Sequence, residues 1–242
     1  MEHHHENFIT RNNLATPISI VIAGALIALA IFFDGGSSNN QVPQQAQKAQ
    51  APKAQAVDIS KLRLNVNDPF VGNANAPLTI ALWTDYQCPF CKRFEEDSIT
   101  GIYNDYVKSG KAKIIFKDFA FLGPDSTTAA IAGRAVWEVD QSKYYAWRTE
   151  MYAKQGAERS GWASKDKVIA ITSSVLGASE AARVSSLMET KKDVYQKAID
   201  ADKQEGSSLG VTGTPGTIIG KQFVNGAQSY QTVKPIVEAS LK

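Results

Sequence analysis

The stretch LTIALWTDYQCPFCKRF, residues 78–94, contains the feature that decides the fold. Its first seven residues form an apolar run that is typical of a buried strand. Phe90 and Phe94 begin a series of apolar residues that recur at helical intervals. Cys88 and Cys91, the two cysteines of the chain, therefore fall where a strand gives way to a helix.

The segments that follow extend this pattern into an α/β fold. A second apolar run at residues 112–119 predicts another strand, and strand, helix, strand indicates a right-handed parallel crossover. The pattern is then helical over about residues 124–205, which we expect to form an insertion. Residues 217–224 predict a β-hairpin and residues 232–241 a last helix. Within the insertion we expect helices at residues 126–140, 143–155, 164–176, 179–190 and 193–204.

The first part of the chain differs in composition from the rest. Residues 14–33 contain no charge and match the length that a helix needs to cross a bilayer, so they predict a transmembrane anchor. A cleaved signal peptide is the alternative, although its apolar region is usually shorter. Residues 34–57 have too few apolar side chains to fold and predict a disordered linker. We therefore expect a cytoplasmic tail at residues 1–13 and a folded domain at residues 58–242.

The charge balance and the histidines exclude several classes of function. With 26 basic and 24 acidic residues the chain has no basic excess for binding nucleic acid. The three histidines, His3, His4 and His5, lie on the terminal tail, which leaves the predicted domain without imidazole. Serine–histidine and cysteine–histidine catalysis are therefore excluded, and no metal or organic cofactor is indicated.

Four interpretations of the cysteine pair were weighed. A structural disulfide would close only a small loop, which gains little stability. Structural zinc needs four ligands, whereas the domain offers two thiols. Two inert buried cysteines are a third possibility. Redox chemistry is the interpretation that we favour, because C-x-x-C between a strand and a helix is the thioredoxin-like signature.

The position of each cysteine predicts its role. Cys88 at a helix N-terminus meets unpaired backbone amides and the positive end of the helix dipole, which favour its thiolate. We expect Cys88 to be the nucleophile and Cys91, one turn further along, to be the resolving thiol. Pro89 suits the first helical turn, and the pair Pro89-Phe90 adds no charge. We therefore predict that the reduction potential of the pair lies between those of reductive and of strongly oxidising dithiol proteins.

The chain resembles the DsbA-like branch of the thioredoxin superfamily, especially its membrane-anchored bacterial members. The resemblance covers about residues 67–241 and rests on residues 68–94, on the helical insertion and on LGVTGTPGTIIG near the end. It implies a thioredoxin-like fold in which Pro215, after Thr214, has a cis peptide bond and lies beside the cysteine pair. It also implies that Thr214 holds substrate chains as an added strand, while the insertion caps the active face.

One position departs from this family. Relatives commonly carry an acidic residue six positions before the first cysteine, where this chain has Leu82. Asp85 is a candidate for part of the proton-transfer role of that acid. From the sequence we nevertheless expect Asp85 to be an exposed loop carboxylate, because aspartate is rarely buried.

The leading hypothesis is a membrane-tethered thiol-disulfide oxidoreductase that oxidises dithiols through Cys88 and Cys91. Disulfides persist in oxidising compartments, so the domain is expected outside the cytoplasm, on a single-pass anchor in a bacterial cytoplasmic membrane. The expected partners are unfolded or newly exported polypeptides with cysteines, a membrane redox protein that recycles the pair, and the bilayer around residues 14–33. A reductase or isomerase, or a tethered peptide-binding chaperone, are the alternatives.

Overall fold

The computed structural model describes residues 55–63, 65 and 67–242. In this part of the chain six strands form a mixed sheet in the order β1-β6-β5-β3-β4-β2. Strand β3 pairs parallel with β4 and antiparallel with β5, and β2 runs antiparallel to β4 at the edge. The strands are β1 Gln55–Ala56, β2 Phe70–Gly72, β3 Leu78–Thr84, β4 Ala112–Asp118, β5 Gly216–Ile219 and β6 Gln222–Asn225.

A continuous helical segment connects β3 to β4, which confirms the predicted strand, helix, strand unit. Two stretches within it have the wider π-helical hydrogen bonding, which the sequence did not predict. The segment consists of α2 Pro89–Phe94, η2 Glu95–Ile99, α3 Thr100–Ile102 and η3 Tyr103–Val107. Together with β3 and β4 it forms the framework on which the cysteines are carried.

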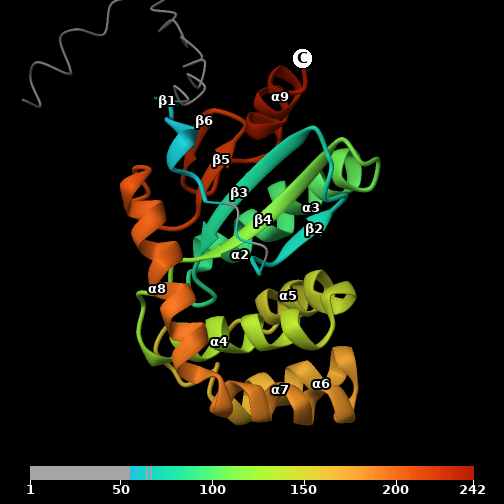
Figure 1. Cartoon of the computed structure of the whole chain (residues 1–242), viewed down its shortest axis with the longest axis vertical. Coiled ribbons are helices and arrows are strands. Elements are labelled where there is room, and N and C mark those ends of the chain that lie inside the picture. Colours follow the sequence, from blue (N-terminus) through green and yellow to red (C-terminus); the bar gives the residue numbers. More distant parts are fainter. Residues whose placement is uncertain (1–54, 64, 66) are drawn as a thin grey trace, which may run out of the picture. The chain divides into compact units, whose positions relative to one another are not determined.

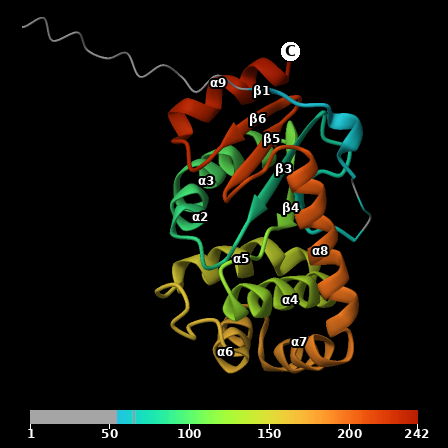
Figure 2. The same ribbon diagram turned by 90° about the vertical axis from the view of Figure 1, so that its left-hand side faces the viewer.

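The predicted helical insertion lies between β4 and β5. In Figure 1 the helices α4 to α7 lie together beyond one end of the sheet, and α8 returns alongside it. The C-terminal ends of β3 and β4 face this insertion (Figure 2). The helices are α4 Pro124–Val139, η4 Gln141–Lys143, α5 Tyr144–Ala153, α6 Lys165–Leu176, α7 Ala178–Thr190 and α8 Lys192–Ser208.

The two faces of the sheet are covered by different helices. Figure 2 shows α2 and α3 on one side and α8 on the other, and α9 Tyr230–Ser240 contacts the α2–α3 segment. Side chains alternate accordingly along β3, because successive residues of a strand point to opposite faces. Ile80 and Leu82 belong to the larger core cluster, whereas Ala81 and Trp83 belong to the smaller one.

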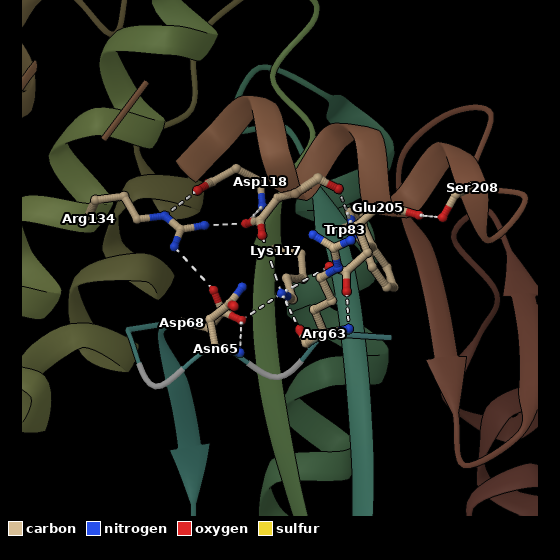
Figure 3. Close-up of polar contacts among 10 residues, drawn as sticks. Arg63, Asn65, Asp68, Trp83, Lys117, Asp118, Arg134, Glu205 and Ser208 are labelled. Carbon is tan, nitrogen blue, oxygen red and sulfur yellow. Dashed lines mark hydrogen bonds and ion pairs between the residues drawn. The ribbon is translucent and has the colours of Figure 1, made fainter. Parts of the chain in front are cut away.

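A buried cluster of charged side chains ties the insertion to the sheet (Figure 3). The ammonium of Lys117 lies 2.6 Å from Asp68, 3.3 Å from Asp202 and 3.0 Å from Glu205. Arg134, from α4, makes ion pairs with Asp68, Asp118 and Asp202. Four carboxylates thus share two cations, and they join α4 and α8 to β4 and to the segment before β2.

The N-terminal predictions fall mostly outside the described residues. The predicted anchor, residues 14–33, lies outside the described residues. Among the helices that the structure describes, none is both long and apolar enough to cross a bilayer. Residues 55 and 56 were predicted as linker but pair with β6, and the amide of Val57 donates to the carbonyl of Lys221 at 2.9 Å. Within the described residues, pairing with the sheet therefore includes Gln55 and Ala56, which lie before Asp58.

Candidate active site

Cys88 is the N-cap residue of α2, and Pro89 occupies the first turn. The backbone of Cys88 is extended, with φ −73° and ψ 118°, so Cys88 lies at the N-terminus of the helix without being part of its first turn. Its carbonyl accepts hydrogen bonds from the amides of Cys91 at 3.0 Å and Lys92 at 3.2 Å. Proline fits here because a first-turn residue has no intrahelical amide bond to lose.

The segment before β5 meets the cysteine pair from the other end of the chain. The Thr214–Pro215 peptide bond is cis, as the family resemblance implied. The thiol of Cys88 donates a hydrogen bond to the carbonyl oxygen of Thr214 at 3.4 Å. Strand β5 brings Thr214 to this place because it pairs directly with β3, the strand that leads to Cys88.

The two thiols are free and differ in environment. Cys91 is 1% exposed and Cys88 is 5% exposed, so Cys91 is the more deeply buried of the two. The pKa of Cys88 is lowered to about 6, by hydrogen bonding from the side chain of Cys91 and then from Thr214 and the amides of Cys91 and Phe90, against the opposing effect of burial. The pKa of Cys91 is raised well above its ordinary value, chiefly by burial.

Two exposed aromatic rings lie on segments that are joined through Asp85, the C-x-x-C itself and the loop that follows β4. Phe90 is 55% exposed, and the guanidinium of Arg93 lies 5.3 Å from the centre of its ring. Phe121 is 46% exposed on the loop that follows β4. An exposed ring next to a reactive sulfur offers apolar contact to an extended polypeptide.

Asp85 differs from its prediction, because it is buried rather than exposed. Its Oδ1 accepts a hydrogen bond from the amide of Gln87 at 2.8 Å, and its Oδ2 accepts from the amides of Phe121 at 2.9 Å and Leu122 at 3.1 Å. Each carboxylate oxygen therefore binds backbone amides. Asp85 joins the loop before Cys88 to the loop that carries Phe121.

The sequence interpretation missed a buried ion pair behind the cysteines. Leu82, at the position where relatives commonly carry an acid, is fully buried and apolar. Glu95 at the end of α2 and Arg148 of α5 are also buried, with a nitrogen–oxygen distance of 3.1 Å. A signal was present in the sequence, since Glu95 follows Cys91 by four residues and so shares its side of the helix.

Among the described residues, no group of three or more His, Cys, Asp or Glu side chains is arranged to hold a metal ion. A C-x-x-C between a strand and a helix of a βαβ unit is the thioredoxin-like redox motif, and the cis Thr214–Pro215 bond beside it agrees with the family resemblance. The family model described as Thioredoxin matches residues 64–239.

Individual relatives agree with this class. Disulfide bond formation protein D of Bacillus subtilis is 25% identical over 179 residues, which are 72% of this chain and 77% of the relative. The solved structure of oxidised BdbD from Bacillus subtilis superposes with a TM-score of 0.67 at 21% identity, over 78% of this chain and 97% of that one. The catalytic domain of Proteus mirabilis ScsC gives 0.62 at 25% identity, over 75% and 93%. The chain belongs to the thioredoxin family and is a DsbA-like thiol-disulfide oxidoreductase.

Proposed function

We propose that this chain is a membrane-tethered, extracytoplasmic oxidoreductase that oxidises dithiols of exported polypeptides, with Cys88 as the catalytic nucleophile and Cys91 as the resolving thiol. The observation that carries the proposal is the position of Cys88 as the N-cap residue of α2, next to the cis Thr214–Pro215 bond, where its pKa is lowered to about 6. At pH 7 a thiol with this pKa is about nine-tenths thiolate. A stable thiolate is a good leaving group, which favours transfer of a disulfide to a substrate.

The reaction consists of two thiol–disulfide exchanges. A substrate thiolate attacks Cys88 Sγ of the oxidised pair, the Cys88–Cys91 bond breaks, and Cys91 takes the electron pair and a proton. A second substrate thiolate then attacks the substrate sulfur of the mixed disulfide and expels Cys88 as thiolate. The substrate loses two electrons and the pair gains them, so a membrane redox partner must reoxidise the pair.

The size of the pKa shift bears on the direction of the reaction. Only the part of the pKa shift that lies below the ambient pH stabilises the reduced form. A Cys88 pKa about one unit below pH 7 stabilises the reduced protein by about 1.4 kcal/mol. For a two-electron couple this raises the reduction potential by about 30 mV relative to an ordinary thiol. This increase in reduction potential favours oxidation of substrates. Because the increase is small, a reductase or isomerase is the second candidate.

The sequence and the relatives together support an extracytoplasmic, membrane-tethered site of action. Residues 14–33 have the length and composition of a membrane anchor, and residues 34–54 have the composition of a tether. A relative described as a disulfide bond formation protein fits an oxidising compartment, where disulfides persist. The exposed Phe90 and Phe121 are suited to binding unfolded polypeptide near the sulfur.

The test compares two activities of the purified full chain in detergent. We expect the oxidised protein to form the disulfide of a reduced dithiol peptide faster than the reduced protein reduces insulin. Cys88→Ser should abolish both activities. Rapid insulin reduction with no peptide oxidation would replace the oxidase by the reductase, and full biological activity of Cys88→Ser would favour a peptide-binding chaperone.

A further inference from the structure

The short turn that carries Cys88 is held in part by its own groups. The amide of Cys88 donates to the carbonyl of Asp85 at 3.1 Å, and the amide of Gln87 donates to Asp85 Oδ1 at 2.8 Å. The peptide between Cys88 and Pro89 has no N–H group, so hydrogen bonds can fix it only through its carbonyl. Tyr86 is buried, and its carbonyl therefore also needs a hydrogen-bond donor.

Gln155, from the helical insertion, supplies a donor to both of these carbonyls. Its Nε2 atom lies 2.6 Å from the carbonyl oxygen of Tyr86 and 3.1 Å from that of Cys88. A side-chain amide nitrogen has two hydrogens, so one Nε2 can serve two acceptors. The two contacts fix the peptide before Gln87 and the peptide after Cys88 at the same time. They reach the turn from 69 and 67 positions further along the chain.

The backbone that carries the Gln155 side chain is itself fixed. Gln155 is half-buried just after the end of α5, and its amide donates to the carbonyl of Tyr152 at 3.1 Å. The carbonyl of Ala153, at the end of α5, accepts a hydrogen bond from the ammonium of Lys92 on α2 at 3.5 Å. The end of α5 is thus joined to the start of α2, and the side chain that reaches Cys88 projects from a defined position.

A second glutamine makes the reciprocal connection, since it belongs to the turn and reaches the loop after α5. Gln87 is buried, and its Nε2 donates to the carbonyl of Leu122 and to Ser126 Oγ, both at 3.0 Å. Its Oε1 accepts a hydrogen bond from the amide of Arg159 at 2.6 Å. Arg159 has φ 58°, a left-handed conformation that is uncommon for residues other than glycine. The loop after α5 is therefore fixed to the turn at both Gln155 and Arg159.

We propose that Gln155 is a positioning residue for Cys88, the nucleophile of the function proposed above. Its side-chain amide holds the carbonyls of Tyr86 and Cys88, and so keeps the sulfur directed toward the amides at the start of α2 and toward Thr214. The helical insertion thereby contributes to the reactivity of a cysteine that lies between β3 and α2.

Loss of this donor would act on Cys88 in two ways. A carbonyl oxygen carries a partial negative charge, and a donor bound to it offsets that charge near the sulfur. A carbonyl of Tyr86 without its donor has to turn toward water, and that rotation moves Cys88. Both effects disfavour the thiolate, because hydrogen bonds from the amides of Phe90 and Cys91 help to lower the pKa of Cys88.

The test is the pH profile of alkylation of the reduced full chain by iodoacetamide in detergent, because the thiolate is the reacting form. Gln155→Met keeps the length of the side chain, adds no charge and removes the donor, and we expect the midpoint of the profile to rise by about half a unit to one unit. Gln155→Lys keeps a donor at similar reach and should leave the midpoint at or below that of the wild type. The matched control is Gln231→Met, at an exposed position on α9, which should keep the wild-type profile. The charged residues that contact the turn or the end of α5, Asp85 and Lys92, are the same in all variants.

A purely structural role would give a different outcome: Gln155→Met would lower the melting temperature and leave the midpoint unchanged, and this result would overturn the proposal. If that variant does not fold, nitrogen-15 NMR of the reduced wild type decides. The side-chain amide signal of Gln155 should shift as Cys88 ionises while that of Gln231 does not, and a Gln155 signal that stays in place would also overturn it. These measurements follow the ionisation of Cys88 without any substrate, so failure of the oxidase proposal alone leaves the test valid.

Discussion

The sulfur of Cys88 lies 3.4 Å from the carbonyl oxygen of Thr214, although 126 positions separate the two residues in the chain. The contact exists because β5 pairs with β3, which places the cis Thr214–Pro215 bond against the start of α2. We therefore expect a substrate that reaches Cys88 to lie beside the backbone of Thr214. The sulfur of Cys88 and the segment that the family resemblance implies as the substrate-holding strand lie together.

The roles of the two cysteines predict which variant traps a substrate. With Cys91→Ala, Cys88 remains the nucleophile but has no intramolecular partner to resolve a mixed disulfide. We expect a stable covalent complex with an activated peptide disulfide, visible by mass spectrometry and released by dithiothreitol. Cys88→Ala should form little complex, since the remaining thiol is buried and its pKa is raised; equal trapping by both variants would reverse the roles.

The lowered pKa of Cys88 also predicts how stability depends on pH. The folded pKa of about 6 lies below the ordinary value of 9.0, so the stabilisation is complete above pH 9 and is lost as pH falls through 6. Relative to the oxidised protein, the reduced protein should therefore lose up to about 1.4 kcal/mol of unfolding free energy per pH unit in this range. Urea unfolding of both forms measures the difference, and the unfolding free energy of Cys88→Ser should lack this dependence on pH.

Asp85 is expected to matter for the shape of the site and for stability. Asp85→Asn replaces one of two accepting oxygens by an amide group that cannot accept the hydrogen bonds of backbone N–H groups. We expect a loss of about 1–3 kcal/mol in the free energy of unfolding, together with slower peptide oxidation. Asp166→Asn, at an exposed position, is the control for loss of a charge. An unchanged unfolding midpoint in Asp85→Asn would show that these bonds contribute little.

The charged cluster predicts a second pH effect, of opposite sign. Burial, together with the neighbouring Asp118 and Asp68, raises the pKa of Asp202 to about 7 despite Arg134 and Lys117. A raised carboxyl pKa stabilises the fold at low pH, and this contribution is lost as pH rises from about 4 through 7.

Asp202→Asn should therefore flatten the dependence of unfolding free energy on pH in that interval, by at most about 1.4 kcal/mol per pH unit. Chemical unfolding between pH 4.5 and 8 provides the measurement. Asp200→Asn, two residues away and exposed, should leave the slope as in the wild type. The same slope in wild type and Asp202→Asn would exclude this residue as the titrating group.

Local patterns were sufficient for most of the framework. Strand β3 has the bounds predicted from its apolar run, and the five insertion helices begin and end within a few residues of their predicted positions. Apolar periodicity determines such elements because each buries one face. Strand β2, Phe70–Gly72, was not predicted, since three residues carry no periodic signal and only pairing with β4 makes them a strand.

The site was predictable where it depends on neighbours in sequence and unpredictable where it depends on distant ones. The position of Cys88 at the helix start follows from the local pattern. Burial of Asp85 results from amides 36 and 37 positions away, and Glu95 meets Arg148 across 53 positions. The sequence alone indicates that such carboxylates are exposed, because the partners that offset their burial come from other elements.

The ionisation of Cys88 is the property on which the proposed chemistry depends, and the ultraviolet absorbance of its thiolate measures it directly. A pH titration of the reduced protein should show one thiolate appearing with a midpoint near pH 6, and Cys88→Ser should remove that transition. A midpoint near 9.0, the ordinary value for a free thiol, would mean that Cys91, Thr214 and the amides at the helix start do not stabilise the thiolate, and would contradict the assignment of Cys88 as the activated nucleophile.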